Sequence, residues 1–268
     1  MIDERFHYGA EQHRSFEDQG FFIFEHFLSE EALATCSQHV DGMLSHRHPD
    51  VEPDVMISTH LQEPLLFALA TQPKLLDLIE YHIGPNILLW ASHLLCKPPN
   101  SGHVVPWHQD APYFNFTGQF APAVWIPFDD IDEDNGAMSV VPGWHKKGKL
   151  PTRPSNFPDG HTEGFNKEIL PSALPDDVEQ RRMPYLLNAG QMAIHNSMIP
   201  HSSPPNRSHR WRRVLVLLFV SPDGQINGKT YKNYKTGEPF EREFILVRGE
   251  DIKGWGLRRN PFETAPAM

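Results

Sequence analysis

The sequence contains little cysteine: only Cys36 and Cys96 occur among its 268 residues. Two thiols are too few for a disulfide framework or for a structural zinc site built from thiolates. We therefore expect both cysteines to be ordinary reduced thiols. With 39% hydrophobic and 22% charged residues, the composition is that of a soluble globular protein with a sizeable core.

Long apolar runs are also absent. The longest, Val214–Val220, is far shorter than the roughly 20 residues that a membrane-spanning helix needs. The first residues include Asp3, Glu4 and Arg5 and no apolar stretch, which argues against a secretory signal peptide. The sequence therefore predicts a cytoplasmic protein that does not enter a membrane.

An excess of positive charge is lacking. The chain has 24 lysines and arginines against 34 aspartates and glutamates, a net charge of -10. That sign repels phosphate backbones and anionic lipid surfaces, so we expect no nucleic-acid partner. A local basic patch stays open, because Arg207, Arg210, Arg212 and Arg213 lie close together in the sequence.

Several familiar catalytic motifs are missing. No Gly-x-Ser-x-Gly or His-Glu-x-x-His occurs, so hydrolase interpretations have no anchor. Gly143–Leu150 is close to a phosphate-binding loop, but Leu150 stands where a Ser or Thr must meet Mg²⁺. Pro151 and Pro154 also prevent the long helix that has to follow. We expect this stretch to be a turn.

Helical patterns come first in the chain and strand patterns follow. The candidate helices are residues 10–19, 30–45, 63–70 and 73–82. The candidate strands are residues 21–24, 86–97, 121–128, 137–141, 190–195 and 213–220. Helices followed by short strands with Pro-, Gly- and Asp-rich turns indicate an antiparallel all-β core with flanking helices.

No repeat, linker or low-complexity tract divides the chain, so we expect a single domain over residues 1–268. Its expected parts are a helical N-terminal region 1–85, a β core 86–222 and a C-terminal extension 223–268. Within the core, residues 143–185 are rich in proline and have no clear period, which is typical of a lid or binding loop.

His108 and Asp110 form the first pair of metal-competent side chains. Side chains at i and i+2 of an extended segment leave the same face of the backbone, so both can reach one cation. His161 and Glu163 have the same spacing, but no strand pattern surrounds them. We expect that second pair to lie on the surface of the predicted lid.

The C-terminal half supplies one more imidazole, His201, in a turn-rich loop before an apolar strand. Arg212 and Arg213 open that strand, and a buried guanidinium needs an anionic partner. Its planar fork suits a carboxylate. Both faces of the strand are apolar, so periodicity does not choose between the two arginines. For the flanking histidines we expect a strand-end hydrogen bond at His195 and solvent exposure at His209.

Two histidines and one carboxylate that leave coordination positions open are the ligand set of non-haem Fe(II) oxygenases. An arginine that binds the far carboxylate of a dicarboxylic keto acid points to 2-oxoglutarate as cosubstrate. A non-catalytic, cupin-like metal-binding module is the alternative. The three ligands together with Arg212 favour the enzyme, because a site without turnover has no need of a carboxylate receptor.

The chain resembles the phytanoyl-CoA dioxygenase family of Fe(II)/2-oxoglutarate-dependent oxygenases over most of its length. Each shared motif is weak alone, but together they are specific. The motifs are Gly20–Phe24 after a helix, Gly84–Ile87, Lys97–Pro99, Trp107–Asp110, Asn135–Gly136 followed by Val140–Lys146, and His201–Ser203 ahead of Arg212.

This resemblance implies that His108, Asp110 and His201 bind Fe(II) and that Arg212 pairs with the far carboxylate of 2-oxoglutarate. The reaction would consume O₂ and release succinate and CO₂. Because Asp110 fills the position where related halogenating enzymes have a small residue, the resemblance favours hydroxylation over halogenation. Desaturation, epoxidation or ring closure are alternatives that the residues do not separate.

The resemblance also implies a fold and a cosubstrate pocket. The expected fold is a double-stranded β-helix (jelly-roll, cupin-like) of about eight strands with N-terminal helices. Trp125 and Ser203 are expected to line the cosubstrate pocket. Ser202 stands where glycine is common in the family, a departure that concerns the geometry of the loop and not the expected ligand.

The substrate is expected to be a small molecule, but the sequence does not name it. Tyr113, Phe114, Asn115, His93 and the segment 143–185 are the expected walls of its pocket. The chain is expected to act as a monomer or a homodimer.

Overall fold

The computed structural model describes residues 1–53, 55–100, 104–113, 118–155, 167–224, 230–233, 235–241 and 243–263. Its helices confirm the expected ones to within two residues at each end. They are α1 (Ala10–Gln19), α2 (Glu30–His46), α3 (Pro64–Ala70), α4 (Pro73–Ile83) and α5 (Val178–Arg181), with 3₁₀ turns η1 (Thr59–Leu61), η2 (Ala111–Tyr113), η3 (Trp144–Lys147) and η4 (Pro171–Ala173).

Helix α2 shows why the N-terminal helices form where they do. The side chain of Ser29 accepts a hydrogen bond from the backbone N–H of Ala32 at 3.2 Å and so caps the first turn. Cys36, Val40 and Met43 follow at helical spacing and are buried. The helix therefore turns one apolar stripe toward the sheet beneath it.

The strands form two larger sheets. The strands are β1 (Phe21–Phe24), β2 (Met56–Ile57), β3 (Ile87–Lys97), β4 (Val105–His108), β5 (Ala123–Pro127), β6 (Ser139–Val140), β7 (Thr152–Pro154), β8 (Lys167–Ile169), β9 (Met183–Pro184), β10 (Met192–His195), β11 (His201–Ser203), β12 (Arg212–Val220), β13 (Thr230–Lys232), β14 (Pro239–Glu241) and β15 (Ile245–Arg248). In the described part of the chain, a seven-stranded sheet has the order β1-β10-β5-β12-β3-β15, with β2 also on β3, and a four-stranded sheet has the order β4-β11-β6-β9.

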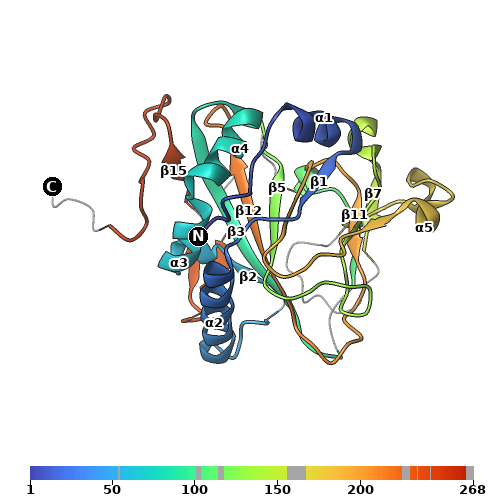
Figure 1. Cartoon of the computed structure of the whole chain (residues 1–268), viewed down its shortest axis with the longest axis horizontal. Helices are drawn as coiled ribbons and strands as arrows, with labels where there is room; N and C mark the ends of the chain where they lie inside the picture. Colours follow the sequence, from blue (N-terminus) through green and yellow to red (C-terminus); the bar gives the residue numbers. More distant parts are fainter. Residues whose placement is uncertain are drawn as a thin grey trace.

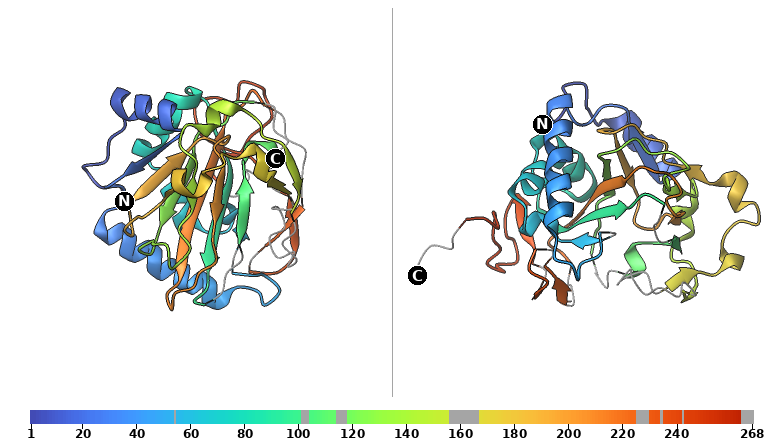
Figure 2. Two further views of the ribbon diagram at one scale, coloured as in Figure 1. Left: turned by 90° about the vertical axis from the view of Figure 1, so that its right-hand side faces the viewer. Right: turned by 90° about the horizontal axis from the view of Figure 1, so that it is seen from below.

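All strand pairs of these two sheets are antiparallel. Figure 1 shows helices α2, α3 and α4 on one side of the large sheet, with β11, β7 and α5 toward the other side. The two further views in Figure 2 show the same layers from the side and from below.

The large sheet is buried on both faces, and its residues alternate between two apolar clusters. Leu215 and Leu217 of β12 pack with α2, α3 and α4, whereas Val214 and Val216 face the four-stranded sheet. Each of these leucines is fully buried and stabilises the fold by about 1.5–3 kcal/mol. Burial on both faces explains why β12 has no alternating polar positions.

The inner apolar cluster lies between the two sheets. It joins Ala193 and Trp125 of the large sheet to Val140 of the small sheet and to Tyr185. Side chains that point inward from both sheets are therefore brought together beside this cluster. His93, Lys97, His195 and Arg212 also point inward, because they alternate with residues of the helix-facing cluster.

The segment 143–185 differs from the sequence expectation. Its described residues contain η3, β7, β8, η4, α5 and β9 rather than a wholly irregular loop. Leu150, Ile169 and Leu174 form a small apolar cluster of their own against Trp107 of β4. Period-based reasoning missed these elements because none is longer than four residues. Among the described residues, no helix combines the length and hydropathy that crossing a bilayer requires.

Gly20 tests how α1 is joined to β1. Its φ of 80° is left-handed, and a Cβ there would lie 2.3 Å from Nδ1 of His145. We expect Gly20→Ala to lower stability by about 1–2 kcal/mol. Gly42 lies within α2 with no atom near its missing Cβ, so Gly42→Ala should raise stability by about 0.5–1 kcal/mol. Denaturant unfolding measures the free energy of unfolding of both variants. A Gly20→Ala variant as stable as the wild type would contradict the prediction.

Candidate active site

The two histidines of the predicted metal site lie opposite each other in the small sheet. Strand β11 pairs with β4 so that His201 is the register partner of His108. Their ring centroids are 4.0 Å apart. Strand pairing thus brings together two residues that are 93 positions apart in the sequence, and Asp110 is the second residue after the end of β4.

The tautomers of both imidazoles are set by the backbone. Nδ1 of His108 lies 2.8 Å from the carbonyl oxygen of Pro106, and Nδ1 of His201 lies 3.0 Å from that of Ile199. A carbonyl only accepts, so each Nδ1 carries a proton and donates. Each Nε2 then offers its lone pair to a metal ion whenever the imidazole is neutral. Backbone orientation of this kind is the usual support for metal-binding histidines.

Both Nε2 atoms converge on one carboxylate oxygen. Oδ1 of Asp110 is 3.6 Å from Nε2 of His108 and 3.5 Å from Nε2 of His201. One donor atom from each of the three residues lies within 4.8 Å of the other two. Two imidazole nitrogens and one carboxylate oxygen are a donor set that suits Fe(II) and leaves coordination positions open. The residues present therefore fit a non-haem iron ion.

The protonation states also suit a cation. Burial lowers the pKa of His108, helped by the nearby charge of His201, so His108 is neutral. Burial alone would raise the pKa of Asp110, but the charge of His201 and the imidazoles of His108, His195 and His201 close to its carboxylate hold that pKa well below its ordinary value. Burial opposes charge on His201, yet the Asp110 carboxylate raises its pKa. Asp110 is therefore ionised, and a metal ion that binds here replaces the proton of His201 as its positive partner.

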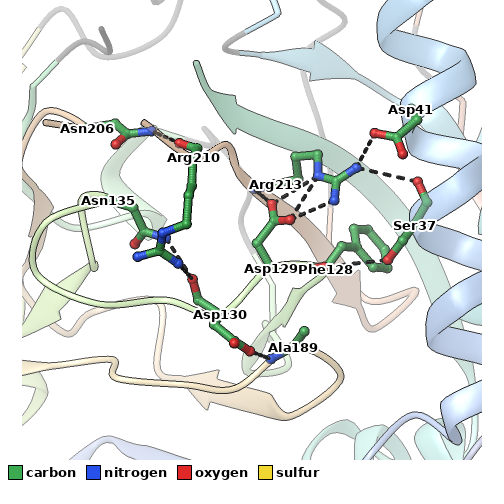
Figure 3. A network of polar contacts seen from close by, with 10 residues as sticks. All are labelled: Ser37, Asp41, Phe128, Asp129, Asp130, Asn135, Ala189, Asn206, Arg210 and Arg213. Carbon is green, nitrogen blue, oxygen red and sulfur yellow. Dashed lines mark hydrogen bonds and ion pairs between the residues drawn. The ribbon is translucent and has the colours of Figure 1, made fainter. Parts of the chain in front are cut away.

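The two arginines at the start of β12 have separate environments. Arg213 points toward the helices, where it makes a forked ion pair with Asp129, at 2.9 Å from Nε and 2.6 Å from Nη2, and a second ion pair with Asp41 (Figure 3). Arg212 points inward, is 4% exposed, and donates from Nη1 to the carbonyl of Gly136 and to Oγ of Ser203, each at 3.1 Å. Only Arg212 therefore shares the inward face with the metal-competent cluster.

A known protein family matches most of the chain. The family model described as phytanoyl-CoA dioxygenase (PhyH) matches residues 16–214. The chain belongs to the PhyH family. Family membership and the donor set confirm the expected enzyme class, a 2-oxoglutarate-dependent non-haem iron dioxygenase, with iron as cofactor and 2-oxoglutarate as cosubstrate.

Individual relatives agree with the PhyH family. Rat peroxisomal phytanoyl-CoA dioxygenase is 25% identical over 80% of this chain and 68% of its own. A probable alpha-ketoglutarate-dependent hypophosphite dioxygenase of Stutzerimonas stutzeri is 28% identical over 80% of this chain and 79% of its own. The solved structure of the non-heme monooxygenase ThoJ, in its apo form, is 26% identical with a TM-score of 0.71, and covers 93% of this chain and 88% of that one.

Lys97 stands beside the arginine in this PhyH chain, although sequence reasoning treated it only as part of a motif. It is the register partner of Arg212 and is 4% exposed. Its Nζ donates to Oγ of Ser203 at 2.8 Å and to the Ser203 carbonyl at 3.2 Å. Alternation along β3 was the available signal, since Lys97 and His93 leave the same face. Lys97, Arg212 and Ser203 make a buried cationic corner.

His195 is the second residue whose place the sequence did not reveal. It is 2% exposed, its Nε2 is 3.6 Å from Oδ2 of Asp110, and its ring lies 5.0 Å from that of His201. The expected strand-end hydrogen bond is not found: Nδ1 has no hydrogen-bond partner among the described residues, and Nε2 faces the candidate metal ligand at ion-pair distance. His209 is exposed and contacts Asn100, as expected.

Gln109 was also missed, although it lies between two predicted ligands. It is 2% exposed. Its amide donates to the carbonyls of Gly148 at 2.8 Å and Met198 at 2.7 Å, and its oxygen accepts from the backbone N–H of Leu150 at 2.8 Å. The side chain therefore ties the His-x-Asp stretch to both the 143–185 segment and the β10–β11 loop.

The remaining expected site residues divide in two. Trp125 is 2% exposed, and its register partner on β12 is Val216. On its other side, Val216 is the register partner of His93 on β3. Trp125 and His93 thus lie in one row on the inward face. Phe114, Asn115, His161 and Glu163 lie outside the described residues, and so does the side chain of Tyr113.

The ion pair between Arg213 and Asp129 is expected to stabilise the fold, and this can be tested. Arg213→Ala removes a largely buried partner of Asp129, whose side chain is 19% exposed, and should cost about 1–3 kcal/mol. Arg210→Ala is the control, because its pair with Asp132 is half exposed and should change stability little. Equal losses in thermal unfolding would contradict the assignment.

Proposed function

We propose that this chain hydroxylates an aliphatic carbon of a small-molecule metabolite, with Fe(II) bound by His108, Asp110 and His201. The observation that carries the proposal is the convergence of two imidazole Nε2 atoms on one carboxylate oxygen, that of Asp110. A bound iron ion supplies activation of O₂ coupled to decarboxylation of 2-oxoglutarate to succinate and CO₂. The chain's own residues hold and orient the reactants and exclude water from them.

Arg212 is the proposed receptor for the far carboxylate of 2-oxoglutarate. It lies on the inward face, next to Lys97 and Ser203, where a dianion meets two buried cations and a hydroxyl. Trp125 supplies a flat apolar wall one strand away. Burial of Arg212 and Lys97 to 4% exposure excludes water and strengthens their attraction to the dianion.

The substrate is proposed to enter from the side of the 143–185 segment, which we propose to be a lid. A cavity of about 640 Å³ borders the described part of that segment and is lined by Trp107, Ser202 and Ser203, whereas His108, Asp110 and His201 do not line it. His93, Tyr113, Phe114 and Asn115 are proposed for the inner walls. Relatives named L-proline trans-4-hydroxylase and ectoine dioxygenase support a small polar metabolite as the substrate class.

We propose that the whole chain is one domain and that its two sheets form a double-stranded β-helix. The support is that the family match runs from residue 16 in the helical part to residue 214 in the β part, and that both sheets share one apolar cluster. Cytoplasmic location, the lack of nucleic-acid partners and a monomeric or homodimeric state stay predictions.

The proposed iron ligands are tested one at a time. His108→Ala, Asp110→Ala and His201→Ala should each abolish succinate formation from 2-oxoglutarate, because each removes one of three ligands. His209→Ala is the matched control, because this exposed histidine should keep full activity. Circular dichroism shows that each variant is folded. Near-normal succinate production by any of the three would remove that residue from the site.

The cosubstrate role separates the two arginines. Arg212→Ala should raise the KM for 2-oxoglutarate by roughly 30-fold or more, since a lost charged contact in a dry pocket costs about 2–5 kcal/mol. Arg213→Ala should leave that KM nearly unchanged, because its partners are Asp129 and Asp41. Titration of 2-oxoglutarate against both variants decides, and the opposite ranking would reassign the receptor.

A further inference from the structure

A second group of metal-competent side chains lies between α1 and α4 in the part of the chain that the structure describes. His13 and Glu17 are one turn apart on α1, and His82 is in the last turn of α4. One donor atom from each lies within 4.8 Å of the other two. Figures 1 and 2 show the two helices side by side at the edge of the molecule.

Tyr8 holds the two imidazoles toward one point. Its phenol oxygen is 3.1 Å from Nδ1 of His13 and 2.7 Å from Nε2 of His82. The ring of Tyr81 packs 4.8 Å from that of His13 and limits its rotation. The phenol hydroxyl donates to one of these nitrogens and accepts from the other, so an ion that binds both displaces the proton that they share with Tyr8. Both rings are oriented before any ion arrives, which lowers the entropy cost of binding.

The His13, Glu17 and His82 group is partly exposed to solvent. His13 and His82 are half-buried and Glu17 is exposed, so an ion reaches all three from outside.

We propose that His13, Glu17 and His82 bind a divalent cation of the zinc class, at a site separate from the iron ligands. Two imidazole nitrogens with one carboxylate oxygen suit Zn²⁺, whereas Mg²⁺ and Ca²⁺ prefer oxygen ligands. Tyr8 places a further oxygen beside both nitrogens. The bound ion joins α1 to α4.

The consequence is structural. Helix α1 continues through Gly20 into β1, the edge strand that pairs with β10. A cation that binds only the folded chain stabilises it in proportion to its concentration over its dissociation constant. Zinc at this site therefore fastens the N-terminal helix, and with it the strand beside His195, to the rest of the molecule.

The experiment uses the full-length, tag-free protein with His108→Ala and Asp110→Ala, so that the proposed iron site cannot bind the probe. Titration calorimetry with Zn²⁺ alone should show one equivalent bound. At a hundredfold excess over the dissociation constant, the Tm should rise by about 5 °C. In the same background, Glu17→Gln should weaken Zn²⁺ binding at least tenfold, and His82→Ala should abolish it.

Two controls separate binding from folding. Glu17 is exposed, so Glu17→Gln should leave the Tm in EDTA unchanged even if His82→Ala lowers it by breaking the contact with Tyr8. His46, in the last turn of α2 as His82 is in α4, should be replaceable by alanine without effect on binding. No Zn²⁺ bound by the folded double variant, or binding that Glu17→Gln leaves unchanged, would overturn the site and leave the proposed oxygenase function untouched.

Discussion

The site depends on one interaction, the antiparallel pairing of β11 with β4. This pairing sets His201 opposite His108 and leaves Asp110 at the end of the strand, where its carboxylate meets both Nε2 atoms. The backbone carbonyls two residues before each histidine fix the tautomers. A one-residue slip in register would turn one imidazole to the opposite face of the sheet, so the remaining structure serves to hold that register.

The large sheet contributes the buried cationic side chains, and its two faces have different roles. Its outer face packs against the helices, and on that face Arg213 forms ion pairs with Asp129 and Asp41. Its inner face carries the cations, Lys97 and Arg212. One strand therefore uses two neighbouring arginines for two purposes, and strand alternation alone divides them. Between the sheets, Asp110 contacts His195 of this inner face, and the cationic corner that is proposed for the cosubstrate lies on the same face.

The sequence was sufficient for the helices and the main strands, because each leaves a local signal: a cap or a period. His108 and Asp110 left an i, i+2 pair, whereas His201 was joined to them by the resemblance to the family. The sequence was not sufficient for residues whose role comes from contacts made across the fold. His195 was assigned a strand-end hydrogen bond, but only the packing of β10 beside β11 brings it to Asp110. Gln109 is tied to three backbone groups that are distant in sequence. Lys97 is recognised as a site residue only once β3 is paired with β12.

The most direct test of the account is an anaerobic crystal structure of the protein with Fe(II) and 2-oxoglutarate, with data collected at the iron absorption edge. The account predicts an anomalous peak in contact with Nε2 of His108, Nε2 of His201 and a carboxylate oxygen of Asp110, and the far carboxylate of 2-oxoglutarate on Arg212. No iron peak among these three residues, or 2-oxoglutarate bound away from Arg212, would contradict it.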